Sequence, residues 1–399
     1  MKRQQQLLLL ILAFGVFSIL NTEMGIIGIL PMAAEMYQVD IVQAGLLVSL
    51  FALGVAIAGP TMPLLFSRFN RKRVMLLVLG VFTLCNALAV FAGDFEVLLV
   101  LRVVPAFFHP VYCALAFSVA AASVAPEDAP RAVARINMGV AAGMVVGVPI
   151  SNVLAATFDF SVAMAFFAGV TGLMFLLTMA FVPDLPVAQP MQYGVQLSVL
   201  KRPPVWLAIV AVICLNGSIF GVYNYLADYL QQIAALPGQF IAALLLVYGL
   251  LNIYGSYLGG NFLAKRPRAT VRLFPLCTIV LCGLLFVSGG QLLPLLVALI
   301  VAWGILGGIN ANINQYLLAC VASDAPDFSN GLFLTAANLG CMAGTMLSGF
   351  FIRSLGLPYV VCGGLVMATT ALLLTKFVHC QADERIGDEH LLLPDGTDR

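Results

Sequence analysis

Twelve apolar runs constrain this chain more than any other feature, because each is close to the ~20 residues that a helix needs to cross a bilayer. The runs are Leu7–Leu30, Gln43–Phe66, Val74–Ala92, Val97–Val124, Ala134–Ala156, Val162–Val182, Val205–Tyr229, Phe240–Phe262, Val271–Gly289, Leu293–Val321, Gly331–Ile352 and Pro358–Val378. Their apolar residues are continuous rather than alternating, which favours helices over barrel strands. The sequence therefore predicts an all-α polytopic membrane protein with twelve transmembrane helices.

Composition excludes the soluble alternatives. Only 9% of the 399 residues are charged and 62% are hydrophobic, whereas soluble domains carry about 25% charged residues. A net charge of +1 provides no basic surface for nucleic acid. The chain has no phosphate-binding loop, no arguable pair of nucleophile and base, and no CxxC pair among its nine cysteines. We therefore expect no enzyme activity, no cofactor and no metal site.

Basic residues predict the orientation of the chain. With the N-terminus inside, all of the 19 lysines and arginines except Arg102 and Arg353 fall in cytoplasmic segments. Arg102 lies inside a run, and Arg353 lies at the outer end of one. The sequence therefore predicts that both termini lie in the cytoplasm.

The longest internal connection divides the chain into two sets of six runs. It carries five prolines, which disfavour a continuous helix. The expected parts are an N-terminal six-helix bundle (1–182), a cytoplasmic linker (183–204), a C-terminal six-helix bundle (205–380) and a cytoplasmic tail (381–399).

The two halves also repeat each other. The fifth run has a row of small residues at Gly139, Gly143 and Gly147, and the eleventh has Gly340 and Gly344. Such rows allow helices to approach closely. Two pseudo-symmetric bundles with a binding site at their interface are typical of transporters.

Polar residues are concentrated in the first and fourth run of each half, while the third and sixth runs are nearly bare. Because polar groups in a membrane face the bundle interior or a water-filled path, we expect the first and fourth helices to line a central cavity. The third and sixth helices are expected to face lipid.

Glu23 is the only acid well inside an apolar run, and Arg102 lies at a similar depth from the outer side. A carboxylate whose surroundings alternate between wet and dry can load and release a proton, so Glu23 is a candidate coupling group. The alternative is a static ion pair that clamps two helices. His109, two turns beyond Arg102, is a candidate proton relay or substrate ligand, or a neutral histidine bonded to a neighbouring helix. Arg102 is either structural or substrate-facing.

The tenth run carries four amides within six residues. Asn310 and Asn314 share one face, and Asn312 and Gln315 an adjacent one. Amides bind hydroxyl-rich or heteroaromatic ligands, so the row indicates substrate binding; the alternative is hydrogen bonding between helices. Tyrosines near the outer end of the seventh run are either cavity aromatics or an interfacial belt. The candidate substrate-binding residues are Asn21, Asn216, Tyr223, Asn224, Tyr225, Asn310, Asn314 and Gln315.

Several local patterns resemble the major facilitator superfamily, and within it the twelve-span drug:proton antiporters of the arabinose/sugar or nucleoside efflux branch. The segment Asn21–Pro31 resembles the first-helix signature of those efflux carriers, and Ala52–Pro60 with Arg68–Arg73 resembles the family's loop after the second span. In that loop Ser67 and Asn70 replace the usual Asp and Gly, so the motif lacks its acidic partner. Gly143–Pro149 resembles the fifth-span antiporter motif.

The resemblance implies the roles of several residues. Arg102 matches the family's fourth-span arginine associated with proton coupling, and His109 falls where the sugar efflux branch often has histidine. The positions implied in conformational change are Arg68, Arg71, Arg73, Gly143, Gly147 and Pro149.

The resemblance thus implies a secondary transporter of the bacterial inner membrane that works by alternating access. We expect it to export a small solute such as a sugar, nucleoside or drug in exchange for protons. The alternative is an importer or uncoupled facilitator on the same fold. The expected partners are a small-molecule substrate, protons and the lipid bilayer, with no nucleic acid, and the expected state is a monomer.

Overall fold

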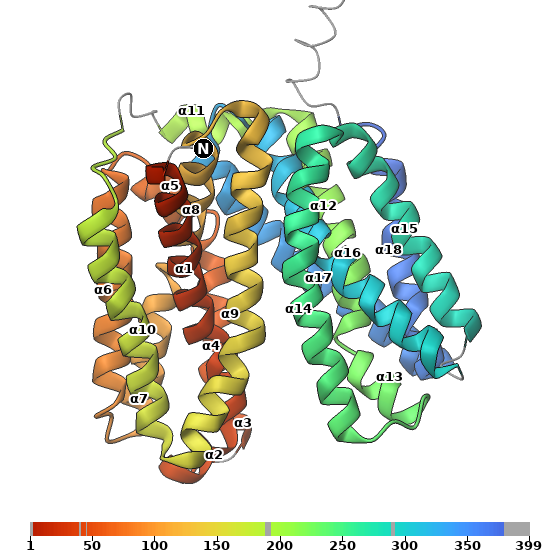
Figure 1. The fold of residues 1–399 in the computed structure, drawn as a ribbon, viewed down its shortest axis with the longest axis horizontal. Helices are drawn as coiled ribbons and strands as arrows, with labels where there is room; N and C mark the ends of the chain where they lie inside the picture. The colour runs from red at the N-terminus through yellow and green to blue at the C-terminus, as the bar shows by residue number, and fades with distance from the viewer. Residues whose placement is uncertain (1–2, 40, 45, 188–192, 289–291, 379–399) are drawn as a thin grey trace, which may run out of the picture.

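Long apolar helices run through the molecule from end to end (Figure 1). The computed structural model describes residues 3–39, 41–44, 46–187, 193–288 and 292–378. Every regular element within these ranges is a helix, so the all-α prediction is confirmed. Positions 188–192 of the predicted linker and the predicted tail, 381–399, lie outside the described residues.

The first half of the chain contains the following helices, where η marks a 3-10 helix: α1 (Arg3–Gly25), η1 (Ile26–Ile29), α2 (Leu30–Tyr37), α3 (Ile41–Ala44), α4 (Leu46–Ala58), α5 (Met62–Phe66), α6 (Arg71–Ala89), α7 (Phe95–Ala106), α8 (His109–Ala122), η2 (Pro126–Asp128), α9 (Ala129–Thr157) and α10 (Phe160–Phe181). The second half contains α11 (Tyr193–Ser198), η3 (Val199–Lys201), α12 (Pro203–Tyr223), α13 (Leu226–Gln232), α14 (Gly238–Lys265), α15 (Pro267–Ser288), α16 (Leu293–Val321), α17 (Pro326–Leu355), η4 (Leu357–Tyr359) and α18 (Val360–Leu374).

Eleven helices of the described residues are long and apolar enough to cross a membrane. The remaining predicted span, Gln43–Phe66, is divided into shorter pieces, with a turn between α4 and α5. Pro60 explains this break, because a proline has no N–H to donate and disfavours the helical conformation of the residue before it. Proline also accounts for the boundary between α7 and α8, where Pro110 occupies the first turn of α8.

The two halves use the same helix pairs, which supports the predicted pseudo-symmetry. The first helix packs on the fifth in each half (α1 on α9, α12 on α17), and the third on the sixth (α6 on α10, α15 on α18). The second packs on the fourth (α4 on α7, α14 on α16).

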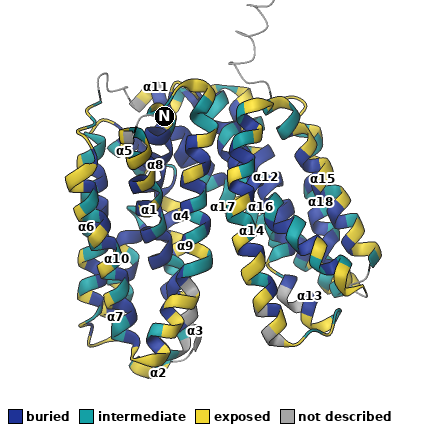
Figure 2. Ribbon diagram, in the orientation of Figure 1, coloured by how far each residue is buried: buried dark blue, intermediate teal, exposed yellow. Residues whose placement is uncertain are grey.

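Burial follows the predicted order of the helices. In the most apolar window of α1, α7–α8, α12 and α16, between 50 and 67% of the residues are buried, against 33–44% in the other spanning helices. Figure 2 shows this difference between inner and outer helices. The first and fourth helices of each half are therefore the central ones, as predicted from their polar residues.

The halves meet at one end of the molecule, which we call the basic end because Arg71, Arg131 and Arg202 lie there beside the start of α1 (Figure 1). Here α5 and α8 contact α17, and α9 contacts α14 and α16. The rings of Phe117 and Phe333 meet edge to face at 5.7 Å. Towards the opposite end α9 and α14 diverge (Figure 1), so this conformation is closed at the basic end.

A surface ion pair lies at the basic end of the second half. Arg202, before α12, donates to Asp324, between α16 and α17, with nitrogen–oxygen distances of 3.0 and 2.6 Å. This hydrogen bond lowers the pKa of Asp324 below its usual value. The pair connects the end of the linker to the α16–α17 turn.

Candidate functional site

A partly buried acid and a buried imidazole lie in contact within the first half. Glu23 is near the end of α1, and His109 is the first residue of α8. Glu23 Oε2 and His109 Nε2 are 3.1 Å apart, with side chains 16% and 7% exposed. Glu23 Oε2 and His109 Nδ1 are buried atoms that form no hydrogen bond within the described residues. Each member of the pair therefore keeps one atom without a hydrogen bond in this conformation.

Arg102 lies beside this pair but contacts the backbone. Its guanidinium, 1% exposed, donates to the carbonyl oxygens of Thr22 at 2.9 Å and Glu23 at 3.4 Å, and lies 5.2 Å from the centre of the Phe51 ring. Both carbonyls belong to the last turn of α1, where helical carbonyls lack intrahelical partners. The alternative of a Glu23–Arg102 side-chain pair is thus not what the structure shows: Glu23 contacts His109, and Arg102 donates to backbone carbonyls of α1.

Three of the predicted substrate residues form one cluster. Asn216 Oδ1, on α12, accepts hydrogen bonds from Asn310 at 3.0 Å and from Asn314 at 3.2 Å, both on α16. Its Nδ2 donates to Ala337 O on α17 at 2.6 Å. The Oδ1 atoms of Asn310 and Asn314 are buried without a partner in the described residues, as are both amide atoms of Asn21 on α1. These four atoms are thus polar groups without a hydrogen bond in this conformation.

Two neighbouring amides of α16 join the halves instead. Gln315 donates to Asn330 of α17 at 2.9 Å, and Asn330 donates to Ala114 O of α8 at 3.4 Å. Asn137 of α9 donates to Asn312 at 3.2 Å. The structure therefore places Gln315 in the contact between the halves and not in the Asn216 cluster.

The predicted residues at the end of α12 separate into two groups. Asn224 donates to Thr345 Oγ1 at 2.7 Å and Tyr225 to Thr345 O at 3.3 Å, which fastens this end to α17. Tyr223 instead stacks on Tyr248 of α14, with ring centres 4.3 Å apart.

Sequence reasoning missed Tyr248 and Trp303, which are buried and leave the Tyr248 hydroxyl and Trp303 Nε1 without partners in the described residues. Close packing at Gly304 and Gly307 brings α16 against Tyr248. An isolated tyrosine or tryptophan in an apolar run carries no such signal, because these residues are also enriched at membrane interfaces.

An arginine of the basic loop after α5 forms an ion pair with an acid of the other half. Arg71 Nη2 is 3.5 Å from Asp327 Oδ2, in the first turn of α17, and the Asp327 side chain is 7% exposed. Ser67, in place of the motif's acid, accepts from Gln196 of α11 at 2.8 Å. Asn70 caps α6 and donates to Asp184 at 2.7 Å. Arg68 and Arg73 are exposed. Sequence reasoning missed Asp327 because its partner lies 256 residues away.

The small residues of the fifth-span motif lie in the contact with α1. A Cβ on Gly143 would lie 2.7 Å from Leu20 Cβ, and one on Gly147 would lie 2.7 Å from Asn21 Oδ1. Pro149 lies inside α9 and is exposed. The two glycines thus bring α9 against the polar segment of α1 that carries Asn21 and Glu23.

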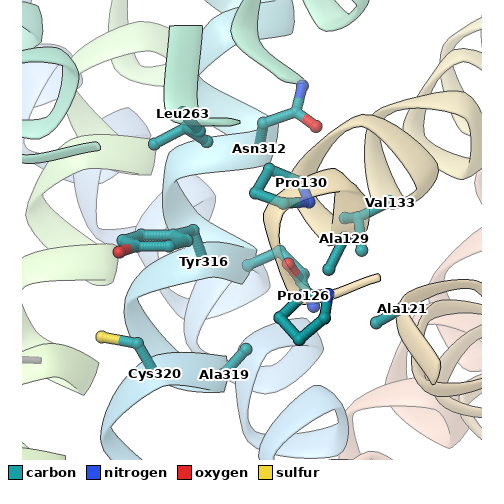
Figure 3. Close-up of a pocket in the computed structure, with 11 residues that line it drawn as sticks. Ala121, Pro126, Ala129, Pro130, Val133, Leu263, Asn312, Tyr316, Ala319 and Cys320 are labelled. Atoms are coloured by element: carbon teal, nitrogen blue, oxygen red, sulfur yellow. The ribbon is translucent and has the colours of Figure 1, made fainter. Parts of the chain in front are cut away.

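A small pocket of about 180 Å³ remains at the basic end between the halves. Figure 3 shows Pro126, Pro130 and Val133 from the first half opposite Asn312 and Tyr316 of α16. The Asn137–Asn312 contact involves one of its lining residues. The pocket is therefore the space left between the halves where they close.

We expect Arg71→Gln to loosen this closure, because it removes a partly buried ion pair worth about 0.5–1 kcal/mol. Deuterium uptake in residues 326–333 should rise about two- to fivefold, as measured by hydrogen-exchange mass spectrometry. Asp327→Asn should reproduce the effect. Arg353→Gln, at the other end of α17, is the control and should leave uptake unchanged; equal uptake in wild type and Arg71→Gln would contradict the role of the pair.

Comparison with known proteins supports the same architecture. The sequence model of the Major Facilitator Superfamily matches residues 12–345. The inner membrane transport protein YdhP of Escherichia coli is 30% identical over 369 residues, which cover 92% of this chain and 94% of the relative. A probable sugar efflux transporter of Helicobacter acinonychis is 26% identical over 373 residues, with the same coverage of 92% and 94%.

Solved structures show a similar fold. The crystal structure of the Escherichia coli fucose:proton symporter FucP superposes with a TM-score of 0.76 at 16% identity, covering 94% of this chain and 98% of that chain. A FucP structure in the outward conformation gives a TM-score of 0.76 at 17% identity, covering 94% and 100%.

Proposed function

Because this chain belongs to the Major Facilitator Superfamily and is a multi-pass membrane transporter, not an enzyme, we propose that it exports a small polar solute in exchange for protons. The observation that carries the proposal is the buried contact of Glu23 with His109 beside Arg102. A carboxylate that exchanges its imidazole contact for water changes its proton affinity, and this change is what coupling to a proton gradient requires.

The proposed site lies between the halves. Asn21, Asn310 and Asn314 provide buried, unpartnered amide atoms, and Tyr223 stacked on Tyr248 provides an aromatic wall. Hydroxyl groups both donate and accept, so they suit a site with free acceptors and donors. We therefore propose a sugar or nucleoside as substrate; sugar efflux relatives support the first choice.

The proposed orientation places the basic end in the cytoplasm, in accordance with the positive-inside rule. The structure is then closed towards the cytoplasm. The Arg71–Asp327 pair and the Asn330 and Asn312 contacts are the interactions that must break when the halves exchange states.

Proteoliposomes with an imposed pH gradient test the coupling, with arabinose as the first probe. Antiport predicts that substrate enters when the lumen is more acidic than the bath, because protons leave as substrate enters. Symport requires an alkaline lumen for the same movement. Entry that is indifferent to the gradient would overturn proton coupling and support the uncoupled facilitator.

We expect Asn314→Ala to weaken substrate binding about three- to tenfold, the effect of losing one hydrogen bond of about 0.5–1.5 kcal/mol. A thermal-shift screen of pentoses, hexoses, nucleosides and drugs would supply the ligand, and titration would measure affinity. Thr278→Ala is the matched control, because that hydroxyl is buried in α15, away from the proposed site, and donates to Phe274 O of its own helix. It should lower the melting temperature without weakening binding. Equal affinity of the wild type and Asn314→Ala would remove Asn314 from the site.

A further inference from the structure

An apolar groove of about 520 Å³ lies where α1 and α9 meet α14 of the other half. Among the residues that line it, Leu10, Phe14 and Tyr257 are 55%, 51% and 54% exposed. Exposed apolar side chains on a membrane-spanning helix contact lipid. The groove therefore opens towards the bilayer, and none of the amides of the Asn216 cluster lines it.

The basic end of the groove carries a cation. Arg135, in the second turn of α9, lines the groove and is exposed. The ion pairs of the described residues do not include Arg135. Arg131, one turn earlier, is occupied by Asp128 and Asn261. Arg135 thus offers a positive charge at the depth where α9 enters the membrane, and lipid phosphates lie at that depth.

The length of the groove matches one leaflet. Along α1 its lining extends from Gln6 to Phe17. The eleven steps between these residues, at about 1.5 Å each, span roughly 16 Å, which is half of the ~30 Å hydrocarbon core of a bilayer. The groove therefore extends from headgroup depth at Arg135 to the middle of the membrane.

We propose that this groove binds one anionic phospholipid of the leaflet at the basic end, with its phosphate on Arg135 and an acyl chain against Phe14 and Tyr257. Charge complementarity selects the anionic headgroup, and the apolar lining accommodates the chain. Because Tyr257 belongs to α14 and Phe14 to α1, the lipid would contact both halves. This proposal depends on neither the direction of transport nor its coupling, so it can fail without affecting the proposed function.

Native mass spectrometry of the purified full chain, with added phosphatidylglycerol or phosphatidylcholine, tests the site. We expect wild type to retain phosphatidylglycerol over phosphatidylcholine. Arg135→Gln should lower the retained phosphatidylglycerol about fivefold, the effect of one basic residue at a lipid surface, and Arg135→Lys should keep it. Ala142→Phe, which fills the groove and leaves the arginine, should lower the retention of both lipids.

Arg272→Gln is the matched control, because Arg272 is an exposed arginine in the second turn of α15 that does not line the groove. Its retention of phosphatidylglycerol should equal that of the wild type. Unchanged retention in Arg135→Gln, or an equal loss in Arg272→Gln, would overturn the headgroup site. Unchanged retention of both lipids in Ala142→Phe would show that the acyl chain does not bind in the groove.

Discussion

Glu23→Gln is expected to abolish accumulation driven by a pH gradient while leaving substrate exchange intact. Each pH unit supplies about 1.36 kcal/mol per proton, or a tenfold substrate ratio. With one proton per cycle, a gradient of about two units sustains roughly a 100-fold ratio in the wild type. Glutamine preserves the size of the side chain but takes up no proton, so the ratio in the variant should fall to near one. Flux measurements in proteoliposomes give the substrate ratio of the wild type and that of the variant.

Counterflow without a pH gradient separates coupling from structure. If Glu23 only clamps helices, Glu23→Gln should lose counterflow and gradient-driven transport together. If Glu23 carries the proton, counterflow should persist. Glu35→Gln is the control, because this carboxylate lies exposed on α2, shortly after the same helix. Full gradient-driven accumulation in Glu23→Gln would refute the coupling role outright.

Gly344→Ala is expected to destabilise the second half by about 3 kcal/mol, the upper end of overpacking effects. A Cβ at Gly344 would lie 2.6 Å from the Gly217 Cα and would collide with the Gly217 carbonyl oxygen. These are backbone atoms of α12, so only separation of α12 from α17 makes room. The Asn216 amide bonds to Ala337 across the same contact and would be displaced. Thermal unfolding of the purified protein measures the loss.

Gly283→Ala is the matched control for this substitution. Gly283 lies inside α15, and a Cβ there would have no atom within 4 Å. Because alanine favours a helix over glycine by up to about 1 kcal/mol, the control should be neutral or more stable. A Gly344→Ala protein that melts with the wild type would contradict the close packing of these helices.

Hydropathy was sufficient to predict most of the fold. The bilayer demands continuous apolar helices of a set length, so the spans could be read from the runs, and Pro60 explains the division of Gln43–Phe66. The repetition of the halves was indicated by the glycine rows. In both halves those glycines lie in the contact of the first helix with the fifth, because close approach there excludes larger residues.

Side-chain partners were harder to predict. Residues 314 and 315 are adjacent, yet Asn314 bonds to Asn216 and Gln315 to Asn330. Successive helical residues point about 100° apart, and only the positions of α12 and α17 decide what each one meets. Asp327 could not be predicted for the same reason. It belongs to the other half of the chain and pairs with Arg71 of the basic loop, where the motif's own acid is absent.

The sequence by itself determined a membrane transporter of twelve predicted spans in two related halves, and it identified Glu23, Arg102 and His109 as rare polar groups in apolar surroundings. Only the tertiary structure decided that the carboxylate of Glu23 contacts His109, while Arg102 donates to a backbone carbonyl near the end of α1. The free-energy cost of placing a polar side chain in the membrane depends on the apolar run that surrounds it, so such residues can be identified from the sequence. Pairing depends on distances between helices, and those exist only once the helices have packed.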